Sequence, residues 1–370
     1  MKQSFFLIIL VGHCCCFMTN QLFQYHVIDE EKSWDEAQKY CRTNHTDLAT
    51  VISMADMKKL NQDLGNKKAW IGLYREAGSS RMWQWSQPDK QFNESQSNWD
   101  EDKDEPNDSD TENCGTVRSS LKWADLSCDR EKPFICYDER NSSHVIYAEE
   151  KRNWTDAQSF CRNHHTDLIS GPEQMQKLNV VEMEQLFPND PSNNLMFIGL
   201  FRDAWQWSDG SNSSFRSWNL NYDDERNVSN CTMLNEEGRW SSENCGDKHP
   251  FICHDDHVIL INESRTWEEA LYYCRHHHHD LVTITNLDEQ RWVQEKTKKA
   301  TTPYVWTGLR FTCTLGFWFW VSDEVVRYKN WASPGQVNEC DMSGAMETGG
   351  EHKWVKKHDK EKFNFFCSKT

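Results

Sequence analysis

One segment occurs three times in the chain, and this repetition constrains the fold more than any other feature. The copies read SWDEAQKYCRTNHTDL from Ser33, NWTDAQSFCRNHHTDL from Asn153 and TWEEALYYCRHHHHDL from Thr266, and they align without a gap. A short run (WIGL, FIGL or WTGL), a Trp-x-Trp pair and two single tryptophans follow each copy in the same order. The repeat of about 115 residues has the length of a small domain, so we expect three tandem domains rather than a solenoid.

Local signals in each repeat predict an α+β fold. Ser33, Asn153 and Thr266 each stand three residues before an acidic residue, which is the pattern of a capping box or a close variant at the start of a helix. Apolar residues then follow at helical spacing. A second helix is expected over 53–60, 172–178 and 287–293, and the Trp-x-Trp pairs alternate as half-buried strands do. We therefore expect two helices packed on short antiparallel sheets in each domain.

Tryptophan and cysteine indicate small cores that disulfides lock. The chain has 18 Trp and 15 Cys, and the repeated positions account for most of the tryptophan. Low aliphatic content with a net charge of −17 would otherwise suggest disorder. The same acidic balance argues against a nucleic-acid partner, because phosphate binding needs a basic surface.

The N-terminus predicts secretion. Residues 1–18 contain a short apolar run behind one lysine, which is typical of a signal peptide, with cleavage near Cys16–Asn20. A buried strand is the alternative. Cleavage would remove three cysteines and leave 12, and no later apolar run predicts a membrane anchor. The sequons of a glycoprotein fit the same compartment; they begin at Asn44, Asn93, Asn107, Asn141, Asn153, Asn212, Asn227, Asn230 and Asn262.

Four cysteines in each of the first two copies allow three pairings, and their spacing alone does not choose among them. The capped helix with its cysteine, the WIGL run, the Cys-x13-Cys pair and the closing Phe-Ile-Cys resemble C-type lectin-like domains, in a tandem arrangement similar to mannose-receptor-type proteins. The resemblance implies domains at 22–137, 144–254 and 257–368. It also implies the pairs Cys41–Cys136, Cys114–Cys128, Cys161–Cys253, Cys231–Cys245 and Cys274–Cys367.

The third copy departs from this pattern. Asp359 stands where the partner of the short disulfide is expected, which leaves Cys340 without its usual partner, and Cys313 is additional. We hypothesise a Cys313–Cys340 bridge, because it restores an even count.

In this family calcium and sugar share one site, and the resemblance places it in the first copy. Glu105 and Asn107 match a Glu-Pro-Asn loop, Glu112 precedes Cys114 by two, and Asp125 matches the last ligand. These oxygens suit calcium, which prefers 6–8 oxygen ligands. Ala124 replaces one ligand, so we expect a weakened calcium and mannose-type sugar site. An acidic loop without an ion is the alternative.

Two other motifs could be mistaken for ligand-binding sites. Gln87-Pro88-Asp89 spells a galactose-type triplet, but it occupies the turn after a Trp-x-Trp strand, so we interpret it as a decoy. The histidines at 276–279 fall at the solvated end of the first helix, where surface histidines are favoured over a metal site. The fragmentary ligand sets at 224–227 and 333–335 predict that the second and third copies lack calcium here.

These features predict a secreted recognition protein rather than an enzyme, since no Ser/His/Asp or Cys/His arrangement suggests a nucleophile. We expect a glycan or glycoprotein ligand, with calcium as cofactor in the first domain only. The alternative is a calcium-independent module that binds protein on the same scaffold.

Overall fold

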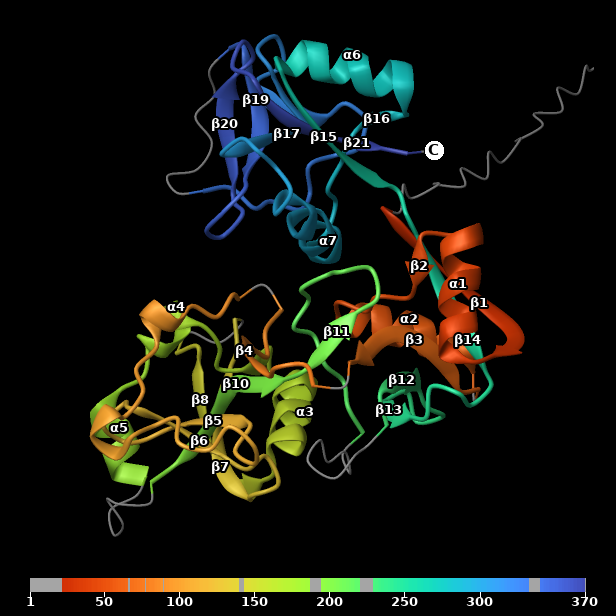
Figure 1. Ribbon diagram of the computed structural model, residues 1–370. Coiled ribbons are helices and arrows are strands. Elements are labelled where there is room, and N and C mark those ends of the chain that lie inside the picture. Colours follow the sequence, from red (N-terminus) through yellow and green to blue (C-terminus); the bar gives the residue numbers. More distant parts are fainter. Residues whose placement is uncertain are drawn as a thin grey trace, which may run out of the picture.

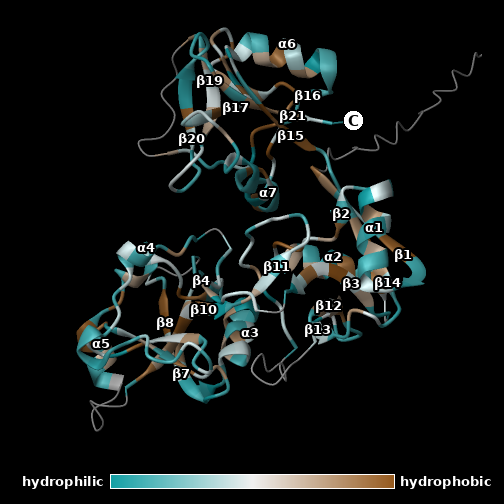
Figure 2. Cartoon of the chain, viewed as in Figure 1, coloured by the Kyte–Doolittle hydropathy of each residue, from teal (hydrophilic) through white to brown (hydrophobic). Residues whose placement is uncertain are grey.

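The computed structural model describes residues 22–65, 67–76, 78–88, 90–139, 143–186, 194–219, 229–332 and 340–369. The predicted signal peptide at 1–18 lies outside them. The described residues form three seven-stranded sheets, each with helices packed on it (Figure 1). The expected α+β class is confirmed. Hydrophobic residues concentrate on the strands, while the helices α1 and α6 alternate hydrophilic and hydrophobic residues (Figure 2).

Two of the three sheets combine strands from different copies. Unit A, as we name it, joins the first half of the first copy to the second half of the second copy. Its strands are β1 (Phe23–Lys32), β2 (Asp47–Leu48), β3 (Ala69–Arg75), β11 (Trp205–Trp207), β12 (Cys231–Leu234), β13 (Trp240–Glu243) and β14 (His249–Asp256). Its helices are α1 (Trp34–Asn44) and α2 (Met54–Leu64).

Unit B is the complement of unit A. It joins the second half of the first copy to the first half of the second. Its strands are β4 (Met82–Trp85), β5 (Cys114–Val117), β6 (Trp123–Leu126), β7 (Lys132–Tyr137), β8 (Val145–Arg152), β9 (Asp167–Leu168) and β10 (Met196–Asp203). Its helices are α3 (Trp154–His164), α4 (Pro172–Met175) and α5 (Val180–Leu186), with short 3-10 turns η1 (Glu94–Gln96) and η2 (Glu101–Lys103).

Unit C contains only the third copy. Its strands are β15 (Val258–Arg265), β16 (Asp280–Leu281), β17 (Tyr304–Thr312), β18 (Phe317–Trp320), β19 (Met342–Glu347), β20 (Trp354–His358) and β21 (Phe363–Ser368). Its helices are α6 (Trp267–His277) and α7 (Leu287–Thr297). The boundaries 22–137 and 144–254 thus describe sequence repeats and not separate sheets, because the first two copies exchange halves.

The exchange changes two disulfides. Cys41 bonds to Cys253 and Cys136 bonds to Cys161. The implied pairs Cys41–Cys136 and Cys161–Cys253 are therefore wrong in this structure, because each long bridge joins a first half to a second half. The pairs Cys114–Cys128, Cys231–Cys245 and Cys274–Cys367 are confirmed, since each lies within one half or within unit C.

A short connection in the second copy explains the exchange. In unit C, Leu309 pairs with Trp320 across a hairpin whose turn ends at Gly316, with φ 73°. If β10 and β11 of the second copy paired in the same register, only Asp203 and Ala204 would remain to form the turn. Two-residue hairpins favour turns with positive φ, which Gly and Asn adopt and Ala disfavours. β10 and β11 therefore continue into different sheets.

A second connection acts in the same direction. β7 ends the first copy and β8 begins the second, and the two strands pair as an antiparallel hairpin. Asp138 donates its backbone N–H to the His144 carbonyl at 2.9 Å to close the turn. Local pairing of this kind costs little loop entropy. Only His257 separates β14 from β15, which is too short for a hairpin, so unit C folds from one copy.

The repeated motifs keep the same roles in all three units. Trp34, Trp154 and Trp267 each donate the indole N–H to a carbonyl of the central strand, at 2.8–2.9 Å. The tryptophans of each second half pack edge to face, as in the pairs Trp85–Trp123, Trp207–Trp240 and Trp320–Trp354. Both networks are built within single halves, so the exchange leaves them intact.

The third copy replaces the short disulfide with polar contacts. Asp359 accepts a hydrogen bond from the Ser343 hydroxyl at 2.6 Å and pairs with Arg310 at 3.2 Å. Cys340 instead bonds to Cys313, which confirms the hypothesised bridge. Ser343, rather than Cys340, occupies the strand position of Cys114. Ser343 and Cys114 each pair with the residue three positions after the tryptophan of the neighbouring strand.

Unit C packs against unit A through α7. Trp292 lies 4.9 Å from Phe23, centroid to centroid, and donates its indole N–H to Asp256 at 2.9 Å. Near this contact Asp56 of α2 is buried, and its carboxylate accepts the Ile52 backbone N–H at 3.1 Å. Burial, reinforced by the charge of Asp288 in α7, raises the pKa of Asp56 to about 7.

We predict that lengthening the connection at Asp203-Ala204 reverses the exchange. Insertion of a Gly/Ser turn there, comparable with the turn at 313–316, would let β10 and β11 form a hairpin. Non-reducing peptide mapping should find Cys41–Cys253 in the native chain and Cys41–Cys136 in a substantial fraction of the insertion variant. Finding Cys41–Cys136 in the native chain would contradict the exchanged structure.

We also predict that Asp56 makes stability fall as the pH rises. Because its folded-state pKa is about 7 against 3.8 ordinarily, the folded chain binds the extra proton between these values, and stability is lost as the pH rises through this window. Asp56→Asn keeps a hydrogen-bond acceptor and should remove up to about 4 kcal/mol of this pH dependence. The midpoint of thermal unfolding, recorded from pH 4 to 8, measures this pH dependence. The control is Asp63→Asn, which changes an exposed acid on the same helix. If the midpoint depends on pH in the same way in both variants, the assignment to Asp56 is wrong.

Candidate functional site

The four predicted ligands gather on one side of unit B. Glu105 and Asn107 lie on the loop after η2, where the Glu105–Pro106 peptide is cis. The backbone N–H of Asn107 donates to Asp125 on β6 at 2.9 Å, and that of Asp108 donates to the other Asp125 oxygen at 3.3 Å. Asp125 therefore fixes the loop from beneath.

The Asn107 side chain contacts the first acid of the loop. Its amide Nδ2 donates to Glu105 Oε2 at 3.1 Å. A glycan on this sequon would be attached at the same nitrogen, so glycosylation of Asn107 would compete directly with the site.

Two arginines, neither predicted from the sequence as part of the site, hold its carboxylates. Arg118, just after β5, pairs with Glu105 at 2.9 Å and with Asp100 at 3.0 Å. Arg202 pairs with Asp125 at 3.1 Å and stacks 4.6 Å above the Trp83 ring. Arg202 comes from β10 of the second copy, so only the exchange brings it here.

The site still carries excess negative charge. Burial raises the pKa of Glu105 to about 7, and the neighbouring Asp125 adds to this while Arg118 opposes it. Burial and the charges of Asp125 and Asp108 also raise the pKa of Glu112. Both shifts mean that burial and neighbouring acids disfavour the charged form of these carboxylates, an effect that a bound cation would oppose.

The donor set fits calcium in kind but not completely. Carboxylate and amide oxygens are the ligands that calcium prefers. Ala124, however, is buried and offers no side-chain oxygen, and Arg202 occupies an Asp125 oxygen that an ion would need. A calcium ion would have to displace at least one arginine contact, so the geometry favours weak binding.

In the other two units, the position equivalent to Asp125 is not acidic. In unit A, Ser242 and Ser229 stand where Asp125 and Glu112 stand in unit B, and Arg75 hydrogen-bonds to the Ser229 carbonyl at 3.3 Å. In unit C, Lys356 occupies the position of Asp125. The predicted fragments at 224–227 and 333–335, and Asp89 of the Gln87-Pro88-Asp89 motif, lie outside the described residues.

The histidine run at 276–279 does not form a ligand cluster. His276 and His277 stack on Tyr272 and Tyr273, each four residues earlier, and His279 donates its backbone N–H to Ser368. Within the described ranges, one group of three potential metal ligands has its ligand atoms within 4.8 Å of one another, and that group is His26, His45 and Asp255.

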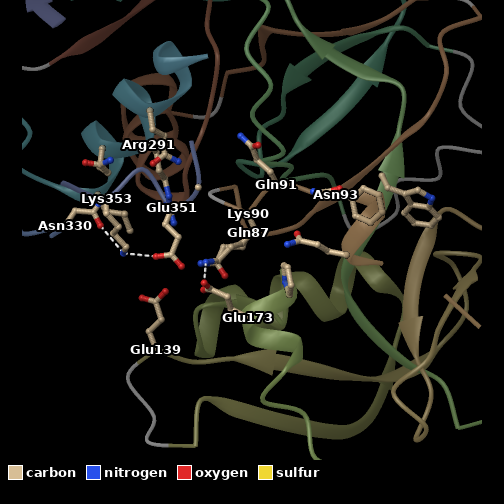
Figure 3. A pocket seen from close by; sticks show the side chains of 18 of the residues that line it. Gln87, Lys90, Gln91, Asn93, Glu139, Glu173, Arg291, Asn330, Glu351 and Lys353 are labelled. Atoms are coloured by element: carbon tan, nitrogen blue, oxygen red, sulfur yellow. Dashed lines mark hydrogen bonds and ion pairs between the residues drawn. The ribbon is translucent and has the colours of Figure 1, made fainter. Parts of the chain in front are cut away.

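A separate groove of about 1090 Å³ lies between units B and C. Figure 3 shows charges of both signs along it, with Lys90 paired to Glu173 at 3.7 Å and Lys353 to Glu351 at 3.5 Å. A hydrogen bond to Glu351 raises the pKa of Glu173. These charges largely compensate one another, so the groove indicates no particular ligand.

The Lectin C-type domain profile matches residues 30–138, 150–255 and 263–369. The chain belongs to the C-type lectin domain family. Two human relatives with tandem domains of this kind are similar to it. C-type mannose receptor 2 is 27% identical over 383 residues, covering 85% of this chain and 24% of the receptor. Lymphocyte antigen 75 is 26% identical, covering 82% of this chain and 21% of its own length.

The chain thus spans about a quarter of these C-type lectin relatives. The crystal structure of human lithostathine aligns with 30% of this chain and 82% of its own, at 26% identity and a TM-score of 0.28. In the described part of this C-type lectin chain, no helix is long and apolar enough to cross a membrane.

We predict that Arg202 holds the site in a calcium-independent state. Arg202→Gln leaves the buried Asp125 without its cationic partner and should lower stability without calcium by about 3–5 kcal/mol. Calcium should then raise the thermal midpoint more in this variant than in the native chain. Arg75→Gln changes the same strand position in unit A, where Ser242 stands in place of Asp125, and is the control. Equal calcium shifts in all three proteins would contradict this role.

Proposed function

We propose that this protein binds carbohydrate through the acidic loop of unit B, with Glu105, Asn107, Glu112 and Asp125 holding calcium. The observation that carries the proposal is the convergence of the loop on Asp125, which both backbone donors reach from Asn107 and Asp108. Membership of the C-type lectin family and similarity to a protein named a mannose receptor support a glycan or glycoprotein ligand.

In this proposal, the bound calcium and the protein side chains each make part of the contacts with the sugar. When bound, calcium supplies a centre that two neighbouring sugar hydroxyls can coordinate. The Glu105 carboxylate accepts hydrogen bonds from those hydroxyls, while the Asn107 amide donates to them. Because Ala124 contributes nothing and two arginines compete, we propose weak binding confined to unit B.

The remaining expectations belong to the same proposal. The protein is secreted after removal of residues 1–18, carries N-linked glycans and has no enzymatic activity. We propose no membrane anchor within this sequence. We also propose no nucleic-acid partner, because the net charge of −17 would repel phosphate groups.

One observation favours a second function. Arg118 and Arg202 already pair with Glu105 and Asp125, as would suit a site that works without calcium. The lectin fold would then serve as a scaffold for calcium-independent recognition of a protein ligand.

A glycan array probed with the full chain, with calcium and with chelator, tests the proposal. Ser109→Ala should be introduced first, because it removes the sequon at Asn107 without changing Asn107. We expect mannose-type binding that chelator abolishes and that Glu105→Gln weakens at least about tenfold, since a ligand is lost. Glu94→Gln, an exposed acid on η1, should change nothing. Sugar binding that persists in chelator would refute the role of calcium, and absence of sugar binding would refute the first function and leave the second.

A further inference from the structure

We propose that His26, His45 and Asp255 form a zinc-binding site in unit A, separate from the calcium site proposed in unit B. His26 Nε2 lies 2.8 Å from Asp255 Oδ2, and His45 Nδ1 lies 3.2 Å from the same oxygen. The two imidazole rings stack with centroids 4.5 Å apart. Both rings thus present a nitrogen to one carboxylate.

The donor atoms suit a transition metal. Zinc binds imidazole nitrogen at about 2.0–2.1 Å and carboxylate oxygen at similar distances, in a tetrahedron whose edges are then about 3.3 Å. The observed separations of 2.8 and 3.2 Å are close to such an edge. Two nitrogen ligands also disfavour calcium, which prefers oxygen. A water molecule would complete the coordination.

The backbone around the cluster is held on several sides. His26 opposes Cys253 in the ladder between β1 and β14, and Cys253 is bonded to Cys41 of α1. His45 caps α1 by donating its backbone N–H to the Cys41 carbonyl at 2.7 Å. One disulfide therefore fixes the three segments that carry the ligands, which reduces the entropy lost on binding an ion.

The ligands remain accessible to an ion. The side chains of His26, His45 and Asp255 are 28%, 17% and 30% exposed. Their partial exposure leaves a path by which an ion can enter, and their partial burial restricts the positions of the side chains.

The other units provide internal comparisons. In unit B the same positions are His144, His165 and Asp138, but His144 is directed to the Asp138 backbone carbonyl at 3.2 Å, while His165 reaches the carboxylate at 3.1 Å. In unit C the position of Asp255 is Lys369, which cannot serve as an acidic ligand. A complete set is gathered in unit A alone, within the described residues.

The test is a zinc titration of the full chain after removal of metals with a chelator, followed by calorimetry. We expect one tight zinc per chain, and cobalt(II) should give the visible absorption of a tetrahedral site. His45→Ala and Asp255→Asn should each weaken binding by more than about tenfold, since even changes behind metal ligands cost 10–100-fold. Asp255→Asn retains the size and a hydrogen-bond acceptor, so circular dichroism should show a folded chain.

Two controls identify the site. The double variant His276→Ala/His277→Ala removes two exposed histidines and should bind zinc as the native chain does. Asp138→Asn changes the equivalent acid of unit B and should also have no effect, whereas without the exchange Asp138 would lie beside His26 and His45. Zinc binding that survives Asp255→Asn and His45→Ala, or that is lost with either control, would overturn the assignment.

Discussion

The two-residue connection at Asp203-Ala204 is the constraint on which the arrangement of the first two repeats depends. A strand that cannot fold back on its neighbour must find another partner, and β11 pairs with β3 of the first copy (Trp207 opposite Leu73). β10 then pairs with β4 (Leu200 opposite Trp85). The long disulfides follow, because each joins the first helix of one half to the last strand of the half that shares its sheet.

The exchange keeps the family fold while changing which residues meet. Motifs contained in one half, such as the tryptophan clusters and the short disulfides, are unaffected. Contacts between halves become contacts between copies. Arg202 therefore lies against the candidate calcium ligand Asp125, and Asp255 lies against His26 and His45. In both places, the chemistry of a site combines residues of two repeats.

The charges of unit B limit what its site can do. Asp125 is fully buried, and an unpaired carboxylate there would be costly, so Arg202 stabilises the fold while competing with an ion. Arg118 has the same double role toward Glu105. The same carboxylates thus pair with arginines that stabilise the fold and would also have to bind the ion. Four matching ligands therefore do not by themselves define a calcium site.

The three repeats, the helix caps, the α+β class, the short disulfides and the candidate ligands can all be predicted from the sequence, because they depend on local patterns or on a family resemblance. The tertiary structure decided the partners of Cys41 and Cys136, the role of Arg202 and the grouping of His26 with His45 and Asp255. Each of these is a contact between distant segments, and equivalent halves of similar sequence offer two pairings. Only the geometry of the connections selects one, and in the sequence the short connection at Asp203-Ala204 is the feature that indicates it.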